Sequence, residues 1–333
     1  MGKPVLVGVD LGGTSFLTVV TNTKGKILSK KKCKTRVEEG AGIILERIAD
    51  TVREAVSSAD ARLKNVRAMG IGVPGPLNPE TGVLLHGPNL GPTWNNTPVA
   101  AYLSERLGCP VYLGNDVNVG AVGEQTLGAA RGYKDVVTIF VGTGIGGGLI
   151  LNGKLYRGTR YTAGEIGHTV LLADGPLCGC GRRGCAEALA SRTAIEREIW
   201  AGIAAGRPSA IPAIMAEMGR QDMSSSVLAA ALEQGDALTE EVMSKAQYYM
   251  GLLVASVVNL LDPEAVVLGG GLVERLGGDY VEPVREVAEQ YYINQQERTK
   301  IHIVEAQLKD QAGALGAAIM ARQSWERDHA RKK

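Results

Sequence analysis

The sequence predicts an α/β fold made of two similar halves. In the first half, an apolar strand at 5–9 is followed by a glycine-rich loop and by a second strand at 16–20. The same order of strand, glycine-rich loop and strand recurs at 136–151. Each unit is followed by helical patterns and by a further strand that ends in glycine, at 69–75 and at 265–271. Strands that alternate with helices are typical of α/β proteins, and the repeated order indicates a duplication.

Turn and helix signals define the elements of the first half. The loop Asp10–Thr14 separates its first two strands, and the turn Asn22–Gly25 follows the second. A helix is predicted at 39–57, where apolar residues recur on one face at Ile44, Leu45, Ile48, Val52 and Val56. Another helix is predicted to begin at Thr97-Pro98 and to end at Gly108, with proline at its first position and glycine after its last turn.

The second half repeats this order with a longer helical part. Its strand, loop, strand and hairpin turn are predicted at 136–141, 142–148, 149–151 and 152–153. A long helix is predicted at about 239–261, before the strand 265–268. The segment 203–235 contains prolines, serines and methionines, and we expect it to be a helical insertion.

Composition and charge favour a soluble enzyme whose partners are small molecules. The chain has 333 residues, of which 45% are hydrophobic, which is enough for two domains with buried cores. Lys and Arg total 36 against 35 Asp and Glu, so the net charge gives no general attraction to nucleic acid or to a membrane surface. Met1–Pro4 lead directly into the first strand, and no uncharged apolar run reaches the roughly 20 residues of a membrane helix. We therefore expect a cytoplasmic protein that binds neither nucleic acid nor membrane.

The two glycine-rich loops are candidate phosphate-binding sites. Gly142–Gly147 matches the dinucleotide pattern G-x-G-x-x-G, but a strand instead of a helix is predicted to follow, which disfavours NAD. We expect the backbone N–H groups of both loops to bind the phosphates of a nucleotide triphosphate, where glycine leaves room for the oxygens. Asp10 is expected to orient Mg²⁺ through water, because hard cations prefer oxygen ligands. Two tight hairpins without any ligand are the alternative.

Asn115-Asp116 lies where a strand at 110–113 gives way to a helix. One interpretation is that these residues only cap the helix. The other is that Asp116 accepts the proton of a substrate hydroxyl during phosphoryl transfer, a reaction that depends mainly on positioning and charge neutralisation.

Three of the five cysteines lie close together, with nine residues between His168 and the first of them. His168, Cys178, Cys180 and Cys185 make a Cys₃His set, the composition of a closed structural zinc site. A metal-free thiol cluster or a disulfide is the alternative. A zinc site would hold Glu165 and Glu187 rigidly, and a solvated surface position is the alternative for either glutamate taken alone.

Taken in this order, the motifs resemble the ROK family of sugar kinases, which is related to certain sugar-responsive repressors. The similarity covers nearly the whole chain and is nearest to the bacterial glucokinases of that family. Its most specific parts are Gly164-Glu-Ile-Gly-His168 and Cys178-x-Cys180-Gly-Arg-Arg-Gly-Cys185-Ala-Glu187.

The resemblance implies an actin-like, ribonuclease-H-like duplicated fold of two domains with the active site in the cleft between them. Residues 1–117 are then the smaller N-terminal α/β domain, with the first phosphate loop and the catalytic aspartate at its edge. Residues 118–308 are the larger C-terminal α/β domain, with the second phosphate loop, the zinc site and an oligomer interface. Residues 309–333 form a C-terminal helix that packs on the N-terminal domain, and the family implies a homodimer or homotetramer.

The resemblance also assigns residues to roles. Asp116 is the catalytic base. The residues implied to contact the sugar are Asn89, Asn115, Asp116, Glu165, His168 and Glu187, so that His168 serves both sugar and zinc. The residues implied to bind the nucleotide are Asp10, Gly12, Gly13, Thr14, Thr143, Gly144, Gly270 and Gly271.

The implied reaction is the phosphorylation of glucose by ATP with Mg²⁺ at the 6-hydroxyl, a step of glycolysis, in a protein with one structural Zn²⁺ per chain. A kinase for N-acetylmannosamine, N-acetylglucosamine, fructose or mannose is the alternative within the class. A non-catalytic sugar-responsive regulator is disfavoured, because the related repressors carry a helix-turn-helix domain before the shared body and this sequence begins at the first loop's strand.

Two departures from the family pattern bear on these roles. Ser15 stands where many relatives have lysine, so we expect no cationic phosphate contact there. The segment 91–97 differs from the commonest form, which leaves the sugar specificity open.

Overall fold

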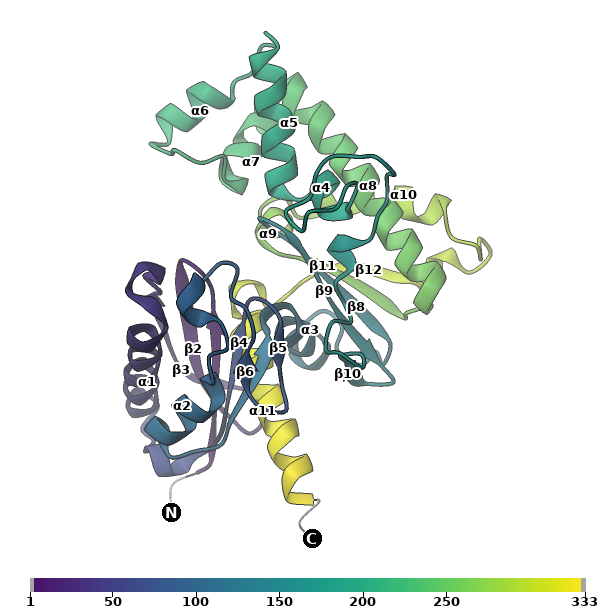
Figure 1. Ribbon diagram of the computed structural model, residues 1–333. Coiled ribbons are helices and arrows are strands. Elements are labelled where there is room, and N and C mark those ends of the chain that lie inside the picture. The colour runs from purple at the N-terminus through teal and green to yellow at the C-terminus, as the bar shows by residue number, and fades with distance from the viewer. Residues whose placement is uncertain (1–2, 331–333) are drawn as a thin grey trace. The chain divides into compact units, whose positions relative to one another are not determined.

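The computed structural model describes residues 3–330, which form two compact units (Figure 1). Unit 1 comprises the described residues up to Gly132, Gly148–Ala163 and those from Asp310 on. Unit 2 comprises Tyr133–Gly147 and Gly164–Lys309. The predicted C-terminal helix extends to 333, and its last three residues lie outside the described part of the chain.

The first sheet has two antiparallel pairs and two parallel ones. Its strand order is β3-β2-β1-β4-β7, with β1–β2 and β2–β3 antiparallel and β1–β4 and β4–β7 parallel. The strands are β1 (Val5–Leu11), β2 (Ser15–Asn22), β3 (Ile27–Lys34), β4 (Val66–Val73) and β7 (Val111–Asn115). A short hairpin, β5 (Leu77–Asn78) with β6 (Val83–Leu84), follows β4. At the free edge, β3 alternates half-buried and exposed residues, and its exposed lysines disfavour pairing with another strand.

Helices cover both faces of this sheet, as Figure 1 shows. The apolar stripe of α1 (Gly40–Ser58) packs with α2 (Val99–Leu107) against alternate residues of β1, such as Val5, Val7 and Val9. On the other face lie α3 (Asp116–Leu127) and α11 (Ala312–Ala330). Here α11 approaches the strands so closely that a Cβ at Gly8 or Gly70 would overlap a backbone carbonyl oxygen of that helix. Glycine at these two strand positions is therefore required by packing.

The second sheet has the same layout as the first, in the order β10-β9-β8-β11-β12. Its strands are β8 (Val136–Val141), β9 (Ile145–Leu151), β10 (Lys154–Tyr156), β11 (Ala265–Gly269) and β12 (His302–Glu305). Strands β8, β11 and β12 are parallel, and β10 is antiparallel to β9. The repeated strand order confirms the predicted duplicated α/β fold.

Unit 2 also carries most of the helices. They are α4 (Ala186–Ala190), α5 (Arg192–Ala204), α6 (Ile211–Glu217), α7 (Ser225–Glu233), α8 (Ala237–Leu261), α9 (Gly271–Leu276) and α10 (Gly278–Gln290). The predicted insertion at 203–235 is thus the end of α5 followed by two short helices, and the long predicted helix is α8. Asp236 caps α8 by accepting a hydrogen bond from the Thr239 N–H at 2.8 Å.

Two predicted boundaries are wrong. The second glycine-rich loop is only 142–144, because Gly147 and Gly148 lie inside β9, where a Cβ would clash with Ile166 or Ala121. These glycines provide close packing instead of loop freedom. Pro98 is the N-cap of α2 and not its first residue, since its ψ of 67° is not helical.

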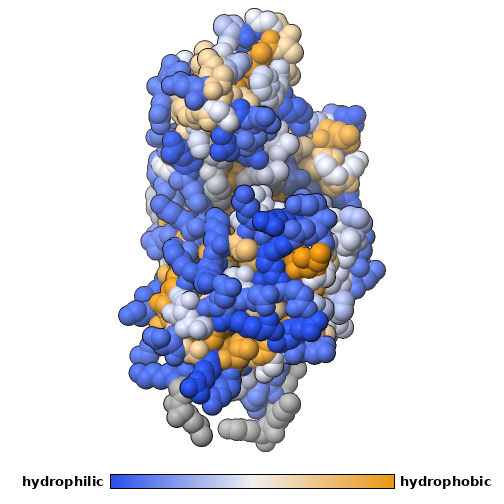
Figure 2. Space-filling model, turned by 90° about the vertical axis from the view of Figure 1, so that its left-hand side faces the viewer, coloured by the Kyte–Doolittle hydropathy of each residue, from blue (hydrophilic) through white to orange (hydrophobic). Residues whose placement is uncertain are grey.

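The surface in Figure 2 is mainly hydrophilic, with hydrophobic residues in small separate groups. Among the helices of residues 3–330, none combines the length and the apolar character that a membrane span needs.

Candidate active site and metal centre

The carboxyl ends of three parallel strands bring Asp10 and Asn115-Asp116 to one edge of the first sheet. Asp10 pairs with Gly72, Gly72 pairs with Gly114, and Asn115 ends β7. A Cβ at Gly72 would lie 2.6 Å from Val119 Cγ2 and 3.4 Å from the Cα of Asp116. The middle strand therefore needs glycine for the start of α3 to pack against it. The carboxyl edge of a parallel sheet is the usual place for a site in such folds.

Asn115 fixes the start of α3. Its Oδ1 accepts hydrogen bonds from the backbone N–H groups of Val117 and Asn118, each at 3.1 Å. Asp116 is the first residue of the helix, and its Oδ1 accepts from the Val117 N–H at 2.9 Å. Capping thus holds the Asp116 carboxylate at the helix N-terminus, where the helix dipole stabilises a negative charge.

Asp10 is a half-buried carboxyl group surrounded by negative charge. Burial, with the carboxylates of Asp116 and Asp310 adding to it, raises the pKa of Asp10 to about 7. A Cβ at Gly313 would overlap the Asp10 carboxyl group, so the beginning of α11 lies directly against it. A carboxyl group in this setting gains stability from a cation, and its oxygen donors suit Mg²⁺.

The first glycine-rich loop, Gly12–Thr14, is held by hydrogen bonds to β2 and to Thr35. The Gly12 N–H donates to the Ser15 carbonyl at 3.1 Å, and the Thr35 hydroxyl donates to the Gly12 carbonyl at 2.6 Å. A Cβ at Gly13 would lie 3.0 Å from the Asn89 carbonyl oxygen, so the loop passes the segment that carries Asn89. Asn89 and Thr14 are exposed. Unit 1 therefore brings together Asp10, this loop, Asn89, Asn115 and Asp116.

Hydrogen bonds join the second loop, Gly142–Gly144, to the start of α5. The Arg192 N–H donates to the Gly142 carbonyl at 2.9 Å, and the Thr193 hydroxyl donates to the Thr143 carbonyl at 2.8 Å. The Arg192 guanidinium also donates to Thr143 Oγ1 at 3.1 Å. Arg192 was not among the residues predicted from the sequence. In the sequence it is only an arginine just after the helix-capping Ser191. Its place at the second loop is visible only in the folded chain.

Glu187 joins the second loop to the cysteine cluster. Its Oε2 accepts from the Ile145 N–H at 3.0 Å, and its Oε1 accepts from the Cys178 thiol at 3.5 Å. A Cβ at Gly144 would overlap the same carboxylate. Glu187 is therefore an anchor of the loop, a contact that the motif alone did not reveal.

Glu165 precedes, and His168 ends, a short turn that packs on the start of β9. Glu165 is exposed and precedes the 3₁₀ turn Ile166–His168, and a Cβ at Gly167 would overlap the Ile145 carbonyl oxygen. Gly270, with a φ of 88°, precedes α9, and a Cβ there would lie 2.6 Å from the Val141 carbonyl oxygen. Unit 2 thus gathers the second loop, Gly270-Gly271, Glu165, His168 and Glu187 around the end of β8 and the start of β9.

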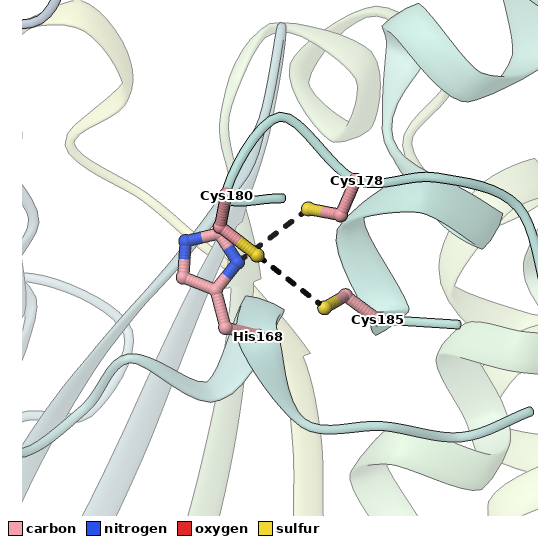
Figure 3. A group of neighbouring side chains, drawn as sticks. All are labelled: His168, Cys178, Cys180 and Cys185. Carbon is pink, nitrogen blue, oxygen red and sulfur yellow. Dashed lines mark hydrogen bonds between the residues drawn. The ribbon is translucent and has the colours of Figure 1, made fainter. Parts of the chain in front are cut away.

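His168 and three cysteines form a compact cluster (Figure 3). Their ligand atoms all lie within 4.8 Å of one another, with 3.7 Å between Cys180 Sγ and Cys185 Sγ and 3.7 Å between Cys178 Sγ and His168 Nδ1. Metal–sulfur bonds of about 2.3 Å give a tetrahedron with edges of about 3.8 Å, so these spacings fit zinc. All five cysteines lie within residues 3–330 and carry free thiols. The other His168 ring nitrogen points away from the sulfur atoms (Figure 3).

A duplicated α/β fold with a glycine-rich loop in each half and a carboxylate at a strand-to-helix junction defines a phosphotransferase of the actin-like, ribonuclease-H-like class. The chain belongs to the ROK family, whose profile matches residues 6–324.

Named relatives narrow the class. The glucokinase of Thermotoga maritima is 36% identical over 323 residues, which cover 97% of this chain and 99% of that protein. The crystal structure of a ROK hexokinase from Thermus thermophilus superposes with a TM-score of 0.82 at 36% identity, covering 97% of this chain and 99% of that one. A ROK family glucokinase from Streptomyces griseus, solved with glucose and AMPPNP, gives a TM-score of 0.79 at 33% identity and covers 96% of this chain and 99% of its own. The protein is a sugar kinase, with a sugar and ATP as its substrates.

Proposed function

We propose that the protein transfers the γ-phosphoryl group of ATP to the 6-hydroxyl of glucose, with Asp116 as the general base. The observation that carries the proposal is the position of Asp116 at the carboxyl edge of the first sheet, fixed by the Asn115 cap. The glucokinase relatives support glucose as the sugar. Glycolysis is then the metabolic setting, in the cytoplasm.

Asp116 is proposed to accept the hydroxyl proton as the phosphoryl group is transferred. Because the transition state of phosphoryl transfer is loose, the group that accepts the hydroxyl proton needs little basicity. An ionised aspartate in the right place therefore suffices. Asp116 lies at a helix N-terminus, where the helix dipole favours a negative charge, and its capped backbone limits the freedom of the carboxylate. Positioning of this kind contributes more to the rate than the strength of the base.

The phosphates are proposed to contact the backbone of the two glycine-rich loops, with Gly270-Gly271 beside the nucleoside. Arg192 is proposed to keep Thr143 oriented, which places a cation beside the second loop. Mg²⁺ bound with ATP would neutralise phosphate charge, and Asp10 would hold it through water.

The side chains proposed to form hydrogen bonds with the sugar hydroxyls are those of Asn89, Asn115, Glu165, His168 and Glu187. Polar side chains in such a set reject analogues that lack the matching hydroxyl, because an unpaired buried polar group costs binding energy. The outward ring nitrogen of His168 is available for this role while Nδ1 faces the sulfur atoms.

Cys178, Cys180, Cys185 and His168 are proposed to hold one structural zinc ion. Zinc would tie the turn of His168 to the loop of the three cysteines, which leads into Glu187, whose carboxylate accepts from the Ile145 N–H next to the second phosphate loop. A homodimer or homotetramer is proposed from the family resemblance.

The test is a matrix of sugars against phosphoryl donors in a coupled assay. Glucose with ATP should give the highest kcat/KM among glucose, mannose, fructose, N-acetylmannosamine and N-acetylglucosamine. A higher kcat/KM for another hexose would reassign the substrate. Turnover with polyphosphate but not with ATP would reassign the donor.

A further inference from the structure

A cavity of about 740 Å³ lies within unit 1, away from the residues described above. It is lined by the start of β7, the turn between β5 and β6, α2, the loop after β10 and the last turns of α11. Its size is that of a small-molecule pocket. Gly313, beside Asp10, is 14 residues from Arg327 in the cavity wall, and α11 rises 1.5 Å per residue, so about 20 Å of helix separates the two places.

Two arginines, Arg157 and Arg327, line this cavity. Burial lowers the pKa of the Arg157 guanidinium, and the charge of Arg327 lowers it further. Within residues 3–330, the Arg157 side chain has no carboxylate partner. Arg327 forms a loose ion pair, with 3.8 Å between its Nε and Asp328 Oδ1. The cavity therefore holds one unpaired cation that is close to a second cation.

The carboxylates in the wall have partners of their own. Asp328 accepts a hydrogen bond from the Tyr112 hydroxyl at 2.9 Å, and Glu80 lies close enough to the Tyr161 hydroxyl to raise its pKa. Neither carboxylate pairs with Arg157. An ion that lies between the two guanidinium groups must consequently come from solution.

The loop that carries Arg157 has a defined conformation. Its ends are joined by a hydrogen bond of 3.1 Å from the Ala163 N–H to the Arg157 carbonyl, and Tyr161 has a φ of 60°. Residues other than glycine seldom adopt such a φ, and those that do cluster at binding sites. Ser324, a buried residue of α11, also lines the cavity.

We infer that this cavity binds a small organic monophosphate, with the phosphate between Arg157 and Arg327 and the remainder of the molecule in the space beside β7 and α2. Two guanidinium groups match the double charge and the planar oxygen pairs of a phosphate. The volume far exceeds that of a bare anion. The hydroxyl groups of Ser324 and the two tyrosines suit a polyhydroxylated body.

The site is tested by calorimetric titration with glucose 6-phosphate and, separately, with inorganic phosphate. Saturating glucose and a non-hydrolysable ATP analogue are present throughout, so that the proposed catalytic residues are occupied. The wild-type protein is compared with Arg157→Gln and with the matched control Arg160→Gln, an exposed arginine outside the cavity wall. Arg157→Gln should weaken the binding of glucose 6-phosphate by roughly 10-fold or more, as expected for a lost charge-assisted hydrogen bond, and Arg160→Gln should not.

Three results would overturn the inference: no saturable binding of glucose 6-phosphate to the wild type, binding that Arg157→Gln leaves intact, or inorganic phosphate binding as tightly as the sugar phosphate. If Arg157→Gln does not fold, Arg327→Gln is used in its place, and Arg157→Lys should retain part of the binding. The kcat for glucose should be unchanged in Arg157→Gln, so failure of this site and failure of the proposed reaction are distinguishable.

Discussion

Replacing Asp10 by asparagine should make the protein more stable above about pH 7, although it removes a group proposed to act in catalysis. Burial, with the charges of Asp116 and Asp310, raises the pKa of Asp10 from 3.8 to about 7. The folded state therefore holds this proton more tightly than the unfolded chain. The stability that the protonated carboxyl group provides is complete below about pH 4 and is lost as the pH rises through about 7.

The size of this effect follows from the shift. About three pKa units correspond to at most ~4 kcal/mol of unfolding free energy. Asp10 is only half-buried, so solvent screening reduces the expected gain in Asp10→Asn to about 1–3 kcal/mol. The gain should be near zero at about pH 4 and should reach its full value at about pH 8.

Urea unfolding of the wild type and Asp10→Asn at both pH values measures this difference. Asp60→Asn, at an exposed position with a φ of 52°, is the control and should change stability little at either pH. A difference between wild type and Asp10→Asn that is the same at both pH values would refute the reasoning. So would a less stable Asp10→Asn at the higher pH.

Three further changes test other contacts. Gly70→Ala should lower the free energy of unfolding by roughly 2–4 kcal/mol, because its Cβ would overlap α11. The control Gly42→Ala, whose Cβ would meet nothing within 4 Å, should be neutral or stabilising. Equal effects of the two changes in urea unfolding would contradict the packing argument. Arg192→Ala should raise the KM for ATP several-fold and leave the KM for the sugar unchanged in steady-state assays, and the opposite pattern would exclude its role at the second loop. Cys180→Ser should lose bound zinc and melt at a lower temperature, and fully active wild type free of zinc by metal analysis would rule out the metal centre.

The sequence was sufficient to predict elements whose causes are local. The stripe of α1 and the glycine that ends α2, Gly108 with a φ of 67°, follow from residues a few positions apart. The repeated strand and glycine order predicted the two matching sheets, because alternating burial and tight turns depend on neighbours in the chain. The cysteine spacing likewise predicted a cluster, since the ligands lie within one short segment and one turn.

Contacts between distant segments were beyond such reasoning. Gly313 lies against Asp10 although about 300 positions separate them, and nothing near Asp10 in the chain indicates this. The glycines at 147–148 gave the same signal as loop glycines, and only the packing of Ile166 and Ala121 explains their place in a strand. Pairs such as Arg157 and Arg327 are visible only once the chain has folded.

The most direct test of the account is the turnover of Asp116→Asn, with Asp60→Asn as the control. Asparagine retains the size of the side chain and the hydrogen bond to the Val117 N–H but cannot accept the hydroxyl proton. The account predicts that kcat with glucose and ATP falls by at least about 100-fold while glucose still binds with nearly the wild-type Kd in calorimetry. An Asp116→Asn enzyme that retains most of its kcat would contradict the central claim.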